Sequence, residues 1–375
     1  MRSWTTVLMR AALSAIHYSG VAAMLAPWMR GKGVIFTLHN VRPEPPEPFE
    51  PNRILKVTPE FLETAIETVQ KAGYDIVALD EAVKRLKADG PTLPFACFTF
   101  DDGYRDNRDF AYPIFKRRNL PFAIYVPTSY PDGEGELWWL ALEAAIRKAD
   151  EIHIMLDGAE RVFETPTPEL KDRAFNEIYW SLRRRPEAEL RAAVREIARR
   201  AGYDASSLCR DLIMSWDELR ALAADPLVTI GAHTRRHFAV ARLPEEEARA
   251  EIAESVARIE QELARPCRHF SFPYGDAESA SARDFAIAGS LGLDTAVTTH
   301  KDVLRPKYEM TGLPRVSLNG DFQDARFVTV MMTGVPFLIV DMARAVLAPL
   351  RGLRPVRSGE GTSRGAATRP GAASI

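Results

Sequence analysis

The feature of this sequence that most constrains its fold is the repeated alternation of short apolar runs with helical segments. Each apolar run has the length of a β-strand, and amphipathic stretches separate most of the runs. Strands that alternate with helices form parallel sheets, and seven or eight such units predict an α/β fold with a closed or nearly closed barrel. The runs are GVIFTL (33–38), DIVAL (75–79), FACFTF (95–100), FAIYV (122–126), LVTIG (227–231), HFSF (269–272), TAVTT (295–299) and PRVSL (314–318).

One connection between the predicted strands is much longer than the others. Residues 130–215 are rich in Arg and Glu and have helical periodicity, so we expect a helical insertion on one barrel loop, as a lid or wall over the site. Trp138 and Trp139 stand near its start. Two adjacent indoles can stack on a sugar, but a hydrophobic seam against the barrel is the more common use of such residues.

The segments outside the barrel have different compositions. We expect residues 1–32 to form an amphipathic helical segment that packs on the domain, with membrane-surface contact or an uncleaved signal as alternatives. Residues 321–350 read as an apolar helix, since Asp341 and Pro336 argue against a membrane span. Residues 351–375 have almost nothing to bury, which predicts a disordered tail.

Composition excludes some classes of function. The 375 residues carry a formal net charge of -2, so no overall charge bias points to nucleic acid. Cys97, Cys209 and Cys267 are widely spaced and odd in number, which excludes a disulfide framework and a CxxC metal site. We therefore expect a cytoplasmic protein, with membrane association and export as alternatives. The oligomeric state stays open.

Polar side chains follow several of the predicted strands at the point where each strand ends. In a (β/α) barrel, the functional residues gather at the carboxyl ends of the strands. The sequence therefore predicts a site at this end of the barrel. Its candidate residues are His39, Asp101, Asp102, His233, His237, Tyr274 and His300.

The pattern HTRRH at residues 233–237 indicates a metal site. Two histidines at positions i and i+4 lie on one face of a helical turn, where both imidazoles can reach one cation. Alone, this pattern is more often a pair of half-exposed surface histidines. With Asp102 as a third ligand, the set leaves coordination positions open for water and substrate, which is typical of a catalytic metal.

The adjacent carboxylates of Asp101 and Asp102 can have separate tasks. If Asp102 binds the metal, Asp101 is free to act as a general base, and Gly103 allows the turn that brings both side chains to one site. A polar Asp-Asp-Gly turn without function is the common alternative. In the stretch FPYG, the backbone amide of Tyr274 can stabilise an oxyanion, although a plain turn explains the stretch equally well.

Three motifs in this order carry a family resemblance: TFDDG (99–103), HTRRH (233–237) and FPYG (272–275). They resemble the motifs of the polysaccharide deacetylases, the NodB-type carbohydrate esterases of family four. The resemblance covers roughly residues 33–320 and implies a distorted (β/α)7–8 barrel of NodB type. It also implies an enzyme that removes N-acetyl, sometimes O-acetyl, groups from amino-sugar polymers. It implies a divalent metal, usually zinc, with cobalt, nickel or manganese as alternatives. The expected partner is an acetylated glycan.

The resemblance also implies roles for individual residues. By motif match, Asp101 is similar to the general base of the family, and the Tyr274 amide to the group that holds the oxyanion. The ligands implied for the metal are Asp102, His233 and His237.

Two positions depart from the family pattern. Many members carry an Arg before the Pro of the third motif, where this sequence has Ser271 and Phe272. Many also have a late Leu-x-His motif that supplies the general acid, and none follows Arg315. The early stretch FTLHNV resembles the permuted branch of the family, in which the first strand supplies the acid.

This likeness assigns the general acid to His39, with His300 as the rival. Arg315 is a candidate to orient the acid or base in place of the missing Arg, although an ion pair with a structural carboxylate explains it as well.

Two other functions compete with deacetylation. A glycoside hydrolase also uses carboxylates at strand ends, but neighbouring aspartates are poorly placed on either side of a glycosidic bond. A non-catalytic carbohydrate-binding protein on the same barrel is the second alternative. Peptidoglycan, chitin oligosaccharide, exopolysaccharide and lipid-linked glycan all remain open as substrates.

Overall fold

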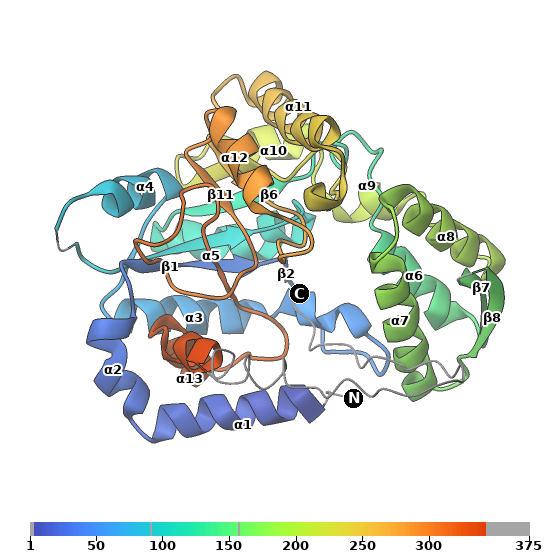
Figure 1. The fold of residues 1–375 in the computed structure, drawn as a ribbon, viewed down its shortest axis with the longest axis horizontal. Coiled ribbons are helices and arrows are strands. Elements are labelled where there is room, and N and C mark those ends of the chain that lie inside the picture. The colour runs from blue at the N-terminus through green and yellow to red at the C-terminus, as the bar shows by residue number, and fades with distance from the viewer. Residues whose placement is uncertain (1–3, 91, 157, 343–375) are drawn as a thin grey trace, which may run out of the picture.

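The centre of the molecule is a curled sheet of parallel strands (Figure 1). A computed structural model describes residues 4–90, 92–156 and 158–342. The main path of the sheet has the order β11-β10-β9-β6-β5-β1-β12, and β4 pairs with β5 beside this path. The strands are β1 (Gly33–Leu38), β4 (Asp75–Ile76), β5 (Phe95–Phe100), β6 (Phe122–Val126), β9 (Val228–Ala232), β10 (His269–Ser271), β11 (Thr295–Val297) and β12 (Val316–Ser317).

The sheet is a half-barrel, since no strand ladder joins β11 to β12 in the described part of the chain. A single parallel bridge between Val297 and Leu313 lies at this opening. The predicted distorted (β/α) barrel is confirmed in this form, and every predicted run contains a strand.

The runs DIVAL (75–79) and PRVSL (314–318) each contain a strand of only two residues, which corrects their predicted lengths. β6 pairs with the later part of β5, through Thr99 and Ala123, so β4 has only the first residues of β5 as a partner. Helix α4 (Leu79–Lys87) then begins, and two acidic residues in its first turn favour that start.

The register of the sheet brings the strand ends to one level. β1 and β5 are paired along their whole length, from Gly33 with Phe95 to Leu38 with Phe100. The Asp101 amide continues this ladder by donating to the Leu38 carbonyl. On the other side, the His233 amide donates to the last carbonyl of β6. The polar residues after β1, β5 and β9 therefore share one edge.

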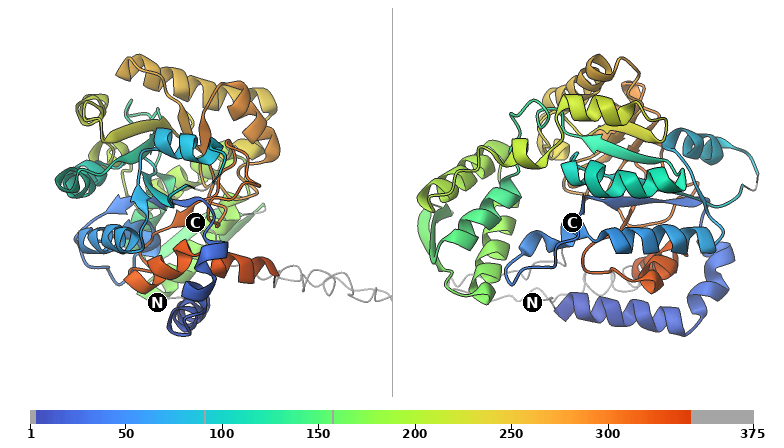
Figure 2. Two further views of the ribbon diagram at one scale, coloured as in Figure 1. Left: turned by 90° about the vertical axis from the view of Figure 1, so that its left-hand side faces the viewer. Right: turned by 180° about the vertical axis from the view of Figure 1, so that it is seen from behind.

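Helices cover the sheet on its outer side, which explains why its strands are continuous apolar runs (Figures 1 and 2). The first of them, α3, begins at a Thr58 cap whose hydroxyl accepts a hydrogen bond from the Phe61 amide. These helices are α3 (Pro59–Lys71), α5 (Tyr112–Arg118), α10 (Trp216–Ala223), α11 (Glu245–Leu263), α12 (Ala282–Ser290) and α13 (Ala325–Met332).

The long connection between β6 and α10 forms a separate layer beside the half-barrel, with its own apolar cluster (Figure 1). Its elements are α6 (Trp138–Lys148), β7 (Glu151–Leu156), β8 (Ala159–Glu164), α7 (Pro168–Arg183), α8 (Glu187–Arg200) and α9 (Leu208–Leu212). The antiparallel hairpin of β7 and β8 corrects the expectation of a purely helical insertion. The signal was an alternation in EIHIML, whose Ile152, Ile154 and Leu156 are buried.

Short elements frame the site between these layers. The parallel pair β2 (Asn40–Val41) and β3 (Lys56–Val57) follows β1, with the 3₁₀ turn η1 (Pro51–Leu55) between its strands. A π-helical turn, η2 (Asn107–Ala111), leads into α5, and a second 3₁₀ turn, η3 (Val240–Arg242), precedes α11.

The segments outside the half-barrel contain more helices than we expected. Residues 1–32 contain α1 (Trp4–Tyr18) and α2 (Val21–Met29), and α1 contacts α13. After α13, a further helix spans Val335–Met342, bent by 64° from it. The expected single helix over 321–350 is therefore broken within its described part. Residues 343–350 and the predicted tail at 351–375 lie outside the described residues.

The described residues contain no single helix that is long and apolar enough to cross a membrane. Two bent pairs of helices have the combined length and apolar composition of a membrane span. These pairs are α1 with α2, and α13 with the helix Val335–Met342.

Candidate metal and catalytic site

Asp102, His233 and His237 come together at the carboxyl edge of the sheet as a buried cluster. One ligand atom from each residue lies within 4.8 Å of the others. Asp102 Oδ1 is 3.3 Å from His237 Nε2 and 3.6 Å from His233 Nε2. Asp102 follows β5, and both histidines follow β9 in a loop, which corrects the helical turn expected for the HTRRH pattern.

The hydrogen bonding of His233 leaves a lone pair facing the carboxylate. His233 Nδ1 lies 2.6 Å from the Ser271 carbonyl oxygen, and a carbonyl only accepts, so this nitrogen carries the hydrogen. Burial lowers the pKa of His233 to about 4, so the ring is neutral near pH 7 and Nε2 is an acceptor. Asp102 Oδ1 is buried and has no hydrogen-bond partner among the described residues. Two acceptors therefore face each other.

This arrangement fits a divalent cation. Buried polar atoms normally have a partner, and a cation between the carboxylate and the two imidazoles would satisfy all three. Two imidazoles and one carboxylate are ligands that zinc accepts, and three protein ligands leave open positions. The residues present therefore suit a catalytic metal rather than a closed structural one.

Several residues of the site have a strained backbone. Six non-glycine residues in the described part of the chain have positive φ, and two of these end helices α5 and α11. The other four belong to the site loops, where strain of this kind often accompanies function. They are Asp102 (73°), Thr234 (61°), His237 (59°) and Tyr274 (60°).

The left-handed turn at Asp102, which continues at Gly103, lets this side chain reach the histidines while Asp101 stays on the strand side. Sequence reasoning identified the turn but not that Asp102 itself adopts the left-handed conformation.

Arg315 forms a two-pronged ion pair with Asp101. Its Nη1 and Nη2 donate to the two carboxylate oxygens at 2.8 and 2.6 Å, and both side chains are buried. Arg315 also donates to the Ser271 hydroxyl and the Thr298 carbonyl. The carboxylate that Arg315 contacts is the candidate base Asp101, and not a separate structural carboxylate.

The two aspartates differ in their pKa. Burial alone would raise the pKa of Asp101, but the charge of Arg315 outweighs it and lowers that pKa. Burial raises the pKa of Asp102, whose oxygen lacks a cationic partner. Asp101 is therefore held ionised by the protein, while Asp102 is a carboxylate that a cation would stabilise.

Ser271 is a site residue that sequence reasoning noted only as a departure from the family pattern. Its carbonyl fixes His233 and its hydroxyl accepts a hydrogen bond from Arg315. It therefore links the candidate metal ligand to the arginine that holds the candidate base. The only signal in the sequence was its place at the end of the run HFSF.

The structure separates the two candidate acid histidines. His39 is half-buried beside the site, where burial lowers its pKa and the charges of Asp102 and Asp101 oppose that shift. Its carbonyl accepts a hydrogen bond of 2.6 Å from the Asn107 side chain. His300 is exposed and its ring contacts Tyr308, 5.9 Å away between centroids.

Tyr274 lies against the cluster with its side chain fixed from three directions. Its hydroxyl accepts a hydrogen bond of 2.8 Å from Trp138 Nε1, its ring lies 4.8 Å from that of His237, and Arg183 covers its face at 3.7 Å. Its backbone amide donates no hydrogen bond to a backbone carbonyl in the part of the chain that the structure describes. The amide is therefore available to a ligand.

The tryptophans at the start of the insertion form a seam between it and the barrel. Trp138 and Trp139 are both buried, and the Trp139 ring lies 5.1 Å from that of His237. Burial excludes the sugar-stacking alternative for both residues in this structure.

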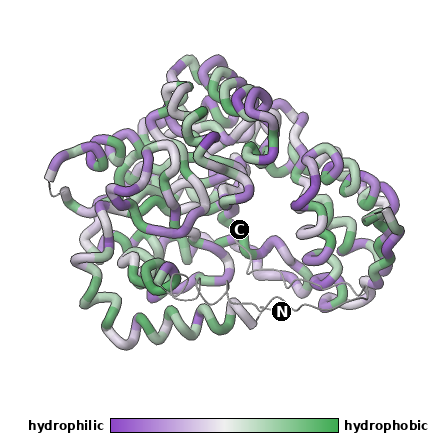
Figure 3. The backbone as a smooth tube through the Cα atoms, viewed as in Figure 1, coloured by the Kyte–Doolittle hydropathy of each residue, from purple (hydrophilic) through white to green (hydrophobic). Residues whose placement is uncertain are grey.

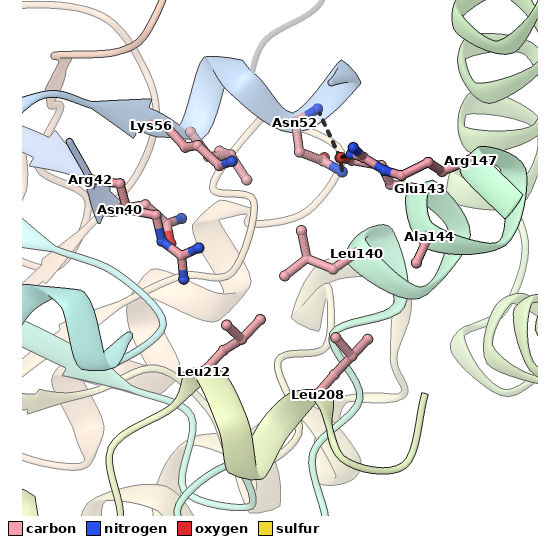
Figure 4. Close-up of a pocket in the computed structure, with 11 residues that line it drawn as sticks. Asn40, Arg42, Asn52, Lys56, Leu140, Glu143, Ala144, Arg147, Leu208 and Leu212 are labelled. Carbon is pink, nitrogen blue, oxygen red and sulfur yellow. Dashed lines mark hydrogen bonds and ion pairs between the residues drawn. The ribbon is translucent and has the colours of Figure 1, made fainter. Parts of the chain in front are cut away.

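A pocket of about 170 Å³ lies between the half-barrel and the insertion (Figure 4). It adjoins the site at two points, since Asn40 follows His39 and Leu140 follows Trp139. A buried hydrogen bond of 2.7 Å joins Asn52 to Glu143 across it. The lining combines polar and apolar groups, namely Asn40, Arg42, Asn52, Leu55, Lys56, Leu140, Glu143, Ala144, Arg147, Leu208 and Leu212.

The curled parallel sheet with a buried Asp-His-His cluster at its carboxyl edge defines a NodB-type (β/α) barrel. A comparison with models of protein families matches residues 90–296 to the polysaccharide deacetylases. Because this match covers more than half of the 375 residues, the chain belongs to the polysaccharide deacetylase family and is a deacetylase enzyme. No curated protein sequence matches the chain.

Three solved structures resemble this chain, and the likeness shows a shared fold. Streptococcus pyogenes deacetylase PplD, in complex with acetate, has a TM-score of 0.54 at 14% identity, over 80% of this chain and 97% of its own. IcaB from Ammonifex degensii has a TM-score of 0.51 at 17% identity, over 80% and 97%. A de-N-acetylase from Aggregatibacter actinomycetemcomitans has a TM-score of 0.50 at 13% identity, over 80% and 99%.

Proposed function

We propose that this protein is a metal-dependent deacetylase that hydrolyses N-acetyl groups on an amino-sugar polysaccharide or oligosaccharide. The observation that carries the proposal is the buried Asp102 carboxylate, which faces the unprotonated Nε2 of His233 beside an independently held Asp101. Membership of the polysaccharide deacetylase family supports the reaction class. One of the proteins with a similar fold is a de-N-acetylase, which supports an amide as the bond cleaved.

Asp102, His233 and His237 would hold the metal, with zinc as the expected ion and cobalt, nickel or manganese as alternatives. When bound, a divalent metal lowers the pKa of water and polarises an acyl oxygen. The fixed tautomer of His233 keeps its Nε2 free for this purpose.

Asp101 accepts the proton of the attacking water in this proposal. Arg315 keeps the carboxylate ionised and fixes both of its oxygens. A lowered pKa makes Asp101 a weaker base, but it guarantees that the base form is present at neutral pH. Arg315 is therefore a positioning residue for the base.

The backbone amide of Tyr274 donates a hydrogen bond to the oxyanion that forms on the acyl group. Its left-handed backbone holds the peptide in place before the reaction, and an oxyanion donor of this kind works because it needs no reorganisation. The seam from Trp138 to Tyr274 keeps this turn rigid.

His39 protonates the departing amine, in the manner of the permuted branch of the family. Burial lowers the pKa of the His39 ring. The charges of Asp102 and Asp101 act in the opposite direction and favour the protonated form that a general acid needs. The Asn107 side chain donates a hydrogen bond to the His39 carbonyl and so fixes the backbone of His39. The exposed position of His300 against Tyr308 gives no support to it as the acid.

The pocket beside the site is suited to a sugar ring of the substrate. Its amide and charged groups can bond to hydroxyls, and its leucines can cover an apolar ring face (Figure 4). The insertion supplies Leu140 and Glu143 to this pocket. We therefore propose that the insertion contributes to the choice of glycan.

Acetate release from a panel of acetylated glycans, measured with and without a chelator, tests the proposal. We expect chelator-sensitive acetate release from at least one N-acetylated oligosaccharide, with the chain length of the glycan unchanged. Shortened chains without acetate would contradict the proposal and favour a glycoside hydrolase. Acetate release that survives complete metal removal would contradict the metal dependence.

A further inference from the structure

We propose that the outer face of the terminal helices binds the surface of an anionic lipid bilayer. The outer face consists of the exposed apolar side chains of α1, α2 and the helix Val335–Met342. This inference is independent of the chemistry proposed for the site.

The exposed large apolar side chains of the described residues are concentrated on this face. Twelve of sixteen lie on the three helices, and the other four are scattered over the barrel and insertion. Soluble surfaces rarely gather such residues in one place. The twelve are Trp4, Val7, Leu8, Met9, Tyr18, Val21, Met24, Trp28, Leu338, Ile339, Val340 and Met342.

Helix α1 shows an apolar stripe on the side away from the protein. Trp4, Leu8 and Tyr18 are 83%, 66% and 74% exposed, and their spacing places them on one side of the helix. The side that packs on the protein carries the buried Leu13 and also Arg10, which lies over the Phe327 ring of α13. A helix whose solvent-facing side is apolar and whose charge faces inward is not expected on a protein surrounded by water.

The other two helices extend the same face. Met24 and Trp28 of α2 are 63% and 71% exposed. A Cβ at Gly334, just before the helix Val335–Met342, would lie 2.5 Å from the Met29 carbonyl at the end of α2. The third helix therefore starts beside α2. Figure 3 shows α1 and α2 as largely hydrophobic segments along one edge of the molecule.

The distribution of charge selects an anionic membrane as the occupant. Residues 1–43 contain five Lys and Arg and no Asp or Glu, and residues 343–375 contain six Arg and one Glu. Residues 44–342 have the opposite balance of charge, with 38 Lys and Arg and 50 Asp and Glu. Arg10 packs inward over Phe327 and Arg42 pairs with Asp106, so the basic residues that can meet lipid are chiefly the arginines that follow the third helix in the sequence. Basic residues next to an apolar face attract anionic lipid.

Aromatic residues and helix length favour binding at the surface. Trp4, Trp28 and Tyr18 have the amphipathic rings that prefer the headgroup region of a membrane. Helix α1 has 15 residues and is about 22 Å long, which is shorter than the apolar core of about 30 Å. A second copy of this chain would bring two basic segments together, so charge disfavours it as the occupant.

Sedimentation with lipid vesicles tests the inference. We expect the full chain to sediment with vesicles of phosphatidylcholine and phosphatidylglycerol, to sediment much less with phosphatidylcholine alone, and to be released by high salt. The double variant Leu8→Glu with Trp28→Glu should lower the bound fraction at least fivefold. Leu93→Glu with Met155→Glu is the matched control, since it adds the same charge at exposed apolar residues elsewhere.

Each other outcome would overturn the inference. These outcomes are no binding to anionic vesicles, equal loss in both double variants, or full binding by the Leu8 and Trp28 variant. Retention after a high-salt alkaline wash would show a spanning anchor instead. A dimer that the Leu8 and Trp28 variant loses, without vesicle binding, would assign the face to a second copy. Thermal unfolding midpoints of both double variants verify that each is folded.

Discussion

Asp101 and Asp102 are adjacent in the chain, and the protein gives their carboxylates opposite surroundings. Arg315 holds both oxygens of Asp101, whereas Oδ1 of Asp102 faces two imidazoles and has no hydrogen-bond partner among the described residues. The first is stabilised as an anion by the protein, and the second requires a cation from outside. This difference divides the pair into one base and one ligand.

Arg315→Lys tests how the base is held. Lys keeps the charge but cannot contact both carboxylate oxygens, so the pKa of Asp101 should rise. We expect kcat/KM to fall at least tenfold and its acidic limb to move to higher pH, in a pH profile of acetate release. An arginine with only a structural role would lower stability and leave the position of that limb unchanged.

Tyr274→Phe separates the amide of this residue from its side chain. The variant keeps the backbone that we assign to the oxyanion and loses only the hydroxyl that accepts from Trp138. We expect kcat within about threefold of the parent and a loss of about 1 kcal/mol in the free energy of unfolding, measured in urea. A thousandfold loss of kcat in a folded variant would instead make the hydroxyl the catalytic group.

At the scale of elements, the insertion is joined to the barrel by Arg105. This residue follows β5 and donates to the Ile213 carbonyl at 2.7 Å and to Glu218 of α10 at 3.0 Å. Burial would raise the pKa of Glu218, but hydrogen bonds from Arg105 and the Ser215 amide lower it to about 2. The ion pair thus fixes the end of the insertion near the site.

Glu218→Gln should weaken this junction in a pH-dependent manner. The pKa of Glu218 lies below its ordinary value of 4.5, so its contribution is present above pH 4.5 and is lost as the pH falls towards 2. Gln keeps the capping role in α10 and removes the charge. We expect the free energy of unfolding of the variant to be about 1 kcal/mol lower than that of the parent at pH 7 and equal to it at pH 2, measured by urea unfolding at each pH. An equal loss of stability at pH 7 and pH 2 would contradict the assignment of this contribution to the charge of Glu218.

Leu208→Trp tests the pocket between the two layers. Leu208 belongs to α9 and lines the pocket, so an indole there should fill it. We expect KM for an oligosaccharide to rise at least fivefold with kcat little changed. Met155→Trp on the exposed hairpin is the control. Equal KM values for the two variants would exclude the pocket as part of the glycan site.

Much of this architecture could be predicted because its signals are local. Strands buried on both faces are continuous apolar runs, and DDG and HTRRH place the ligands directly after two of them. The hairpin of β7 and β8 was missed because it lies within a long stretch that is rich in Arg and Glu and has helical periodicity. The length of β4 was not predicted because it depends on the space that β6 leaves beside β5.

The contacts that define the site chemistry were not predictable in the same way. Arg315 and Asp101 are 214 residues apart, and only the fold brings them together. The left-handed backbone of Asp102, His237 and Tyr274 is not marked by a glycine, and residue type alone does not show which Asp, His or Tyr adopts it. Sequence reasoning therefore found the residues of the site and missed how they are held.

At the scale of the whole molecule, three layers have separate tasks in this account. The half-barrel positions the cluster, the insertion forms one wall of the pocket, and the terminal helices present an apolar face. Because α1 packs on α13 while the pocket lies on the insertion side, membrane binding and glycan binding involve different surfaces (Figures 1 and 2).

The most direct test of the central claim compares Asp101→Asn with Asp102→Ala, with metal content and acetate release measured on the same samples. We predict that Asp101→Asn keeps near-stoichiometric metal and loses at least a thousandfold in kcat. Asp102→Ala should lose both metal and activity. Near-normal acetate release by Asp101→Asn, or full metal content in Asp102→Ala, would contradict the division of the two aspartates into base and ligand.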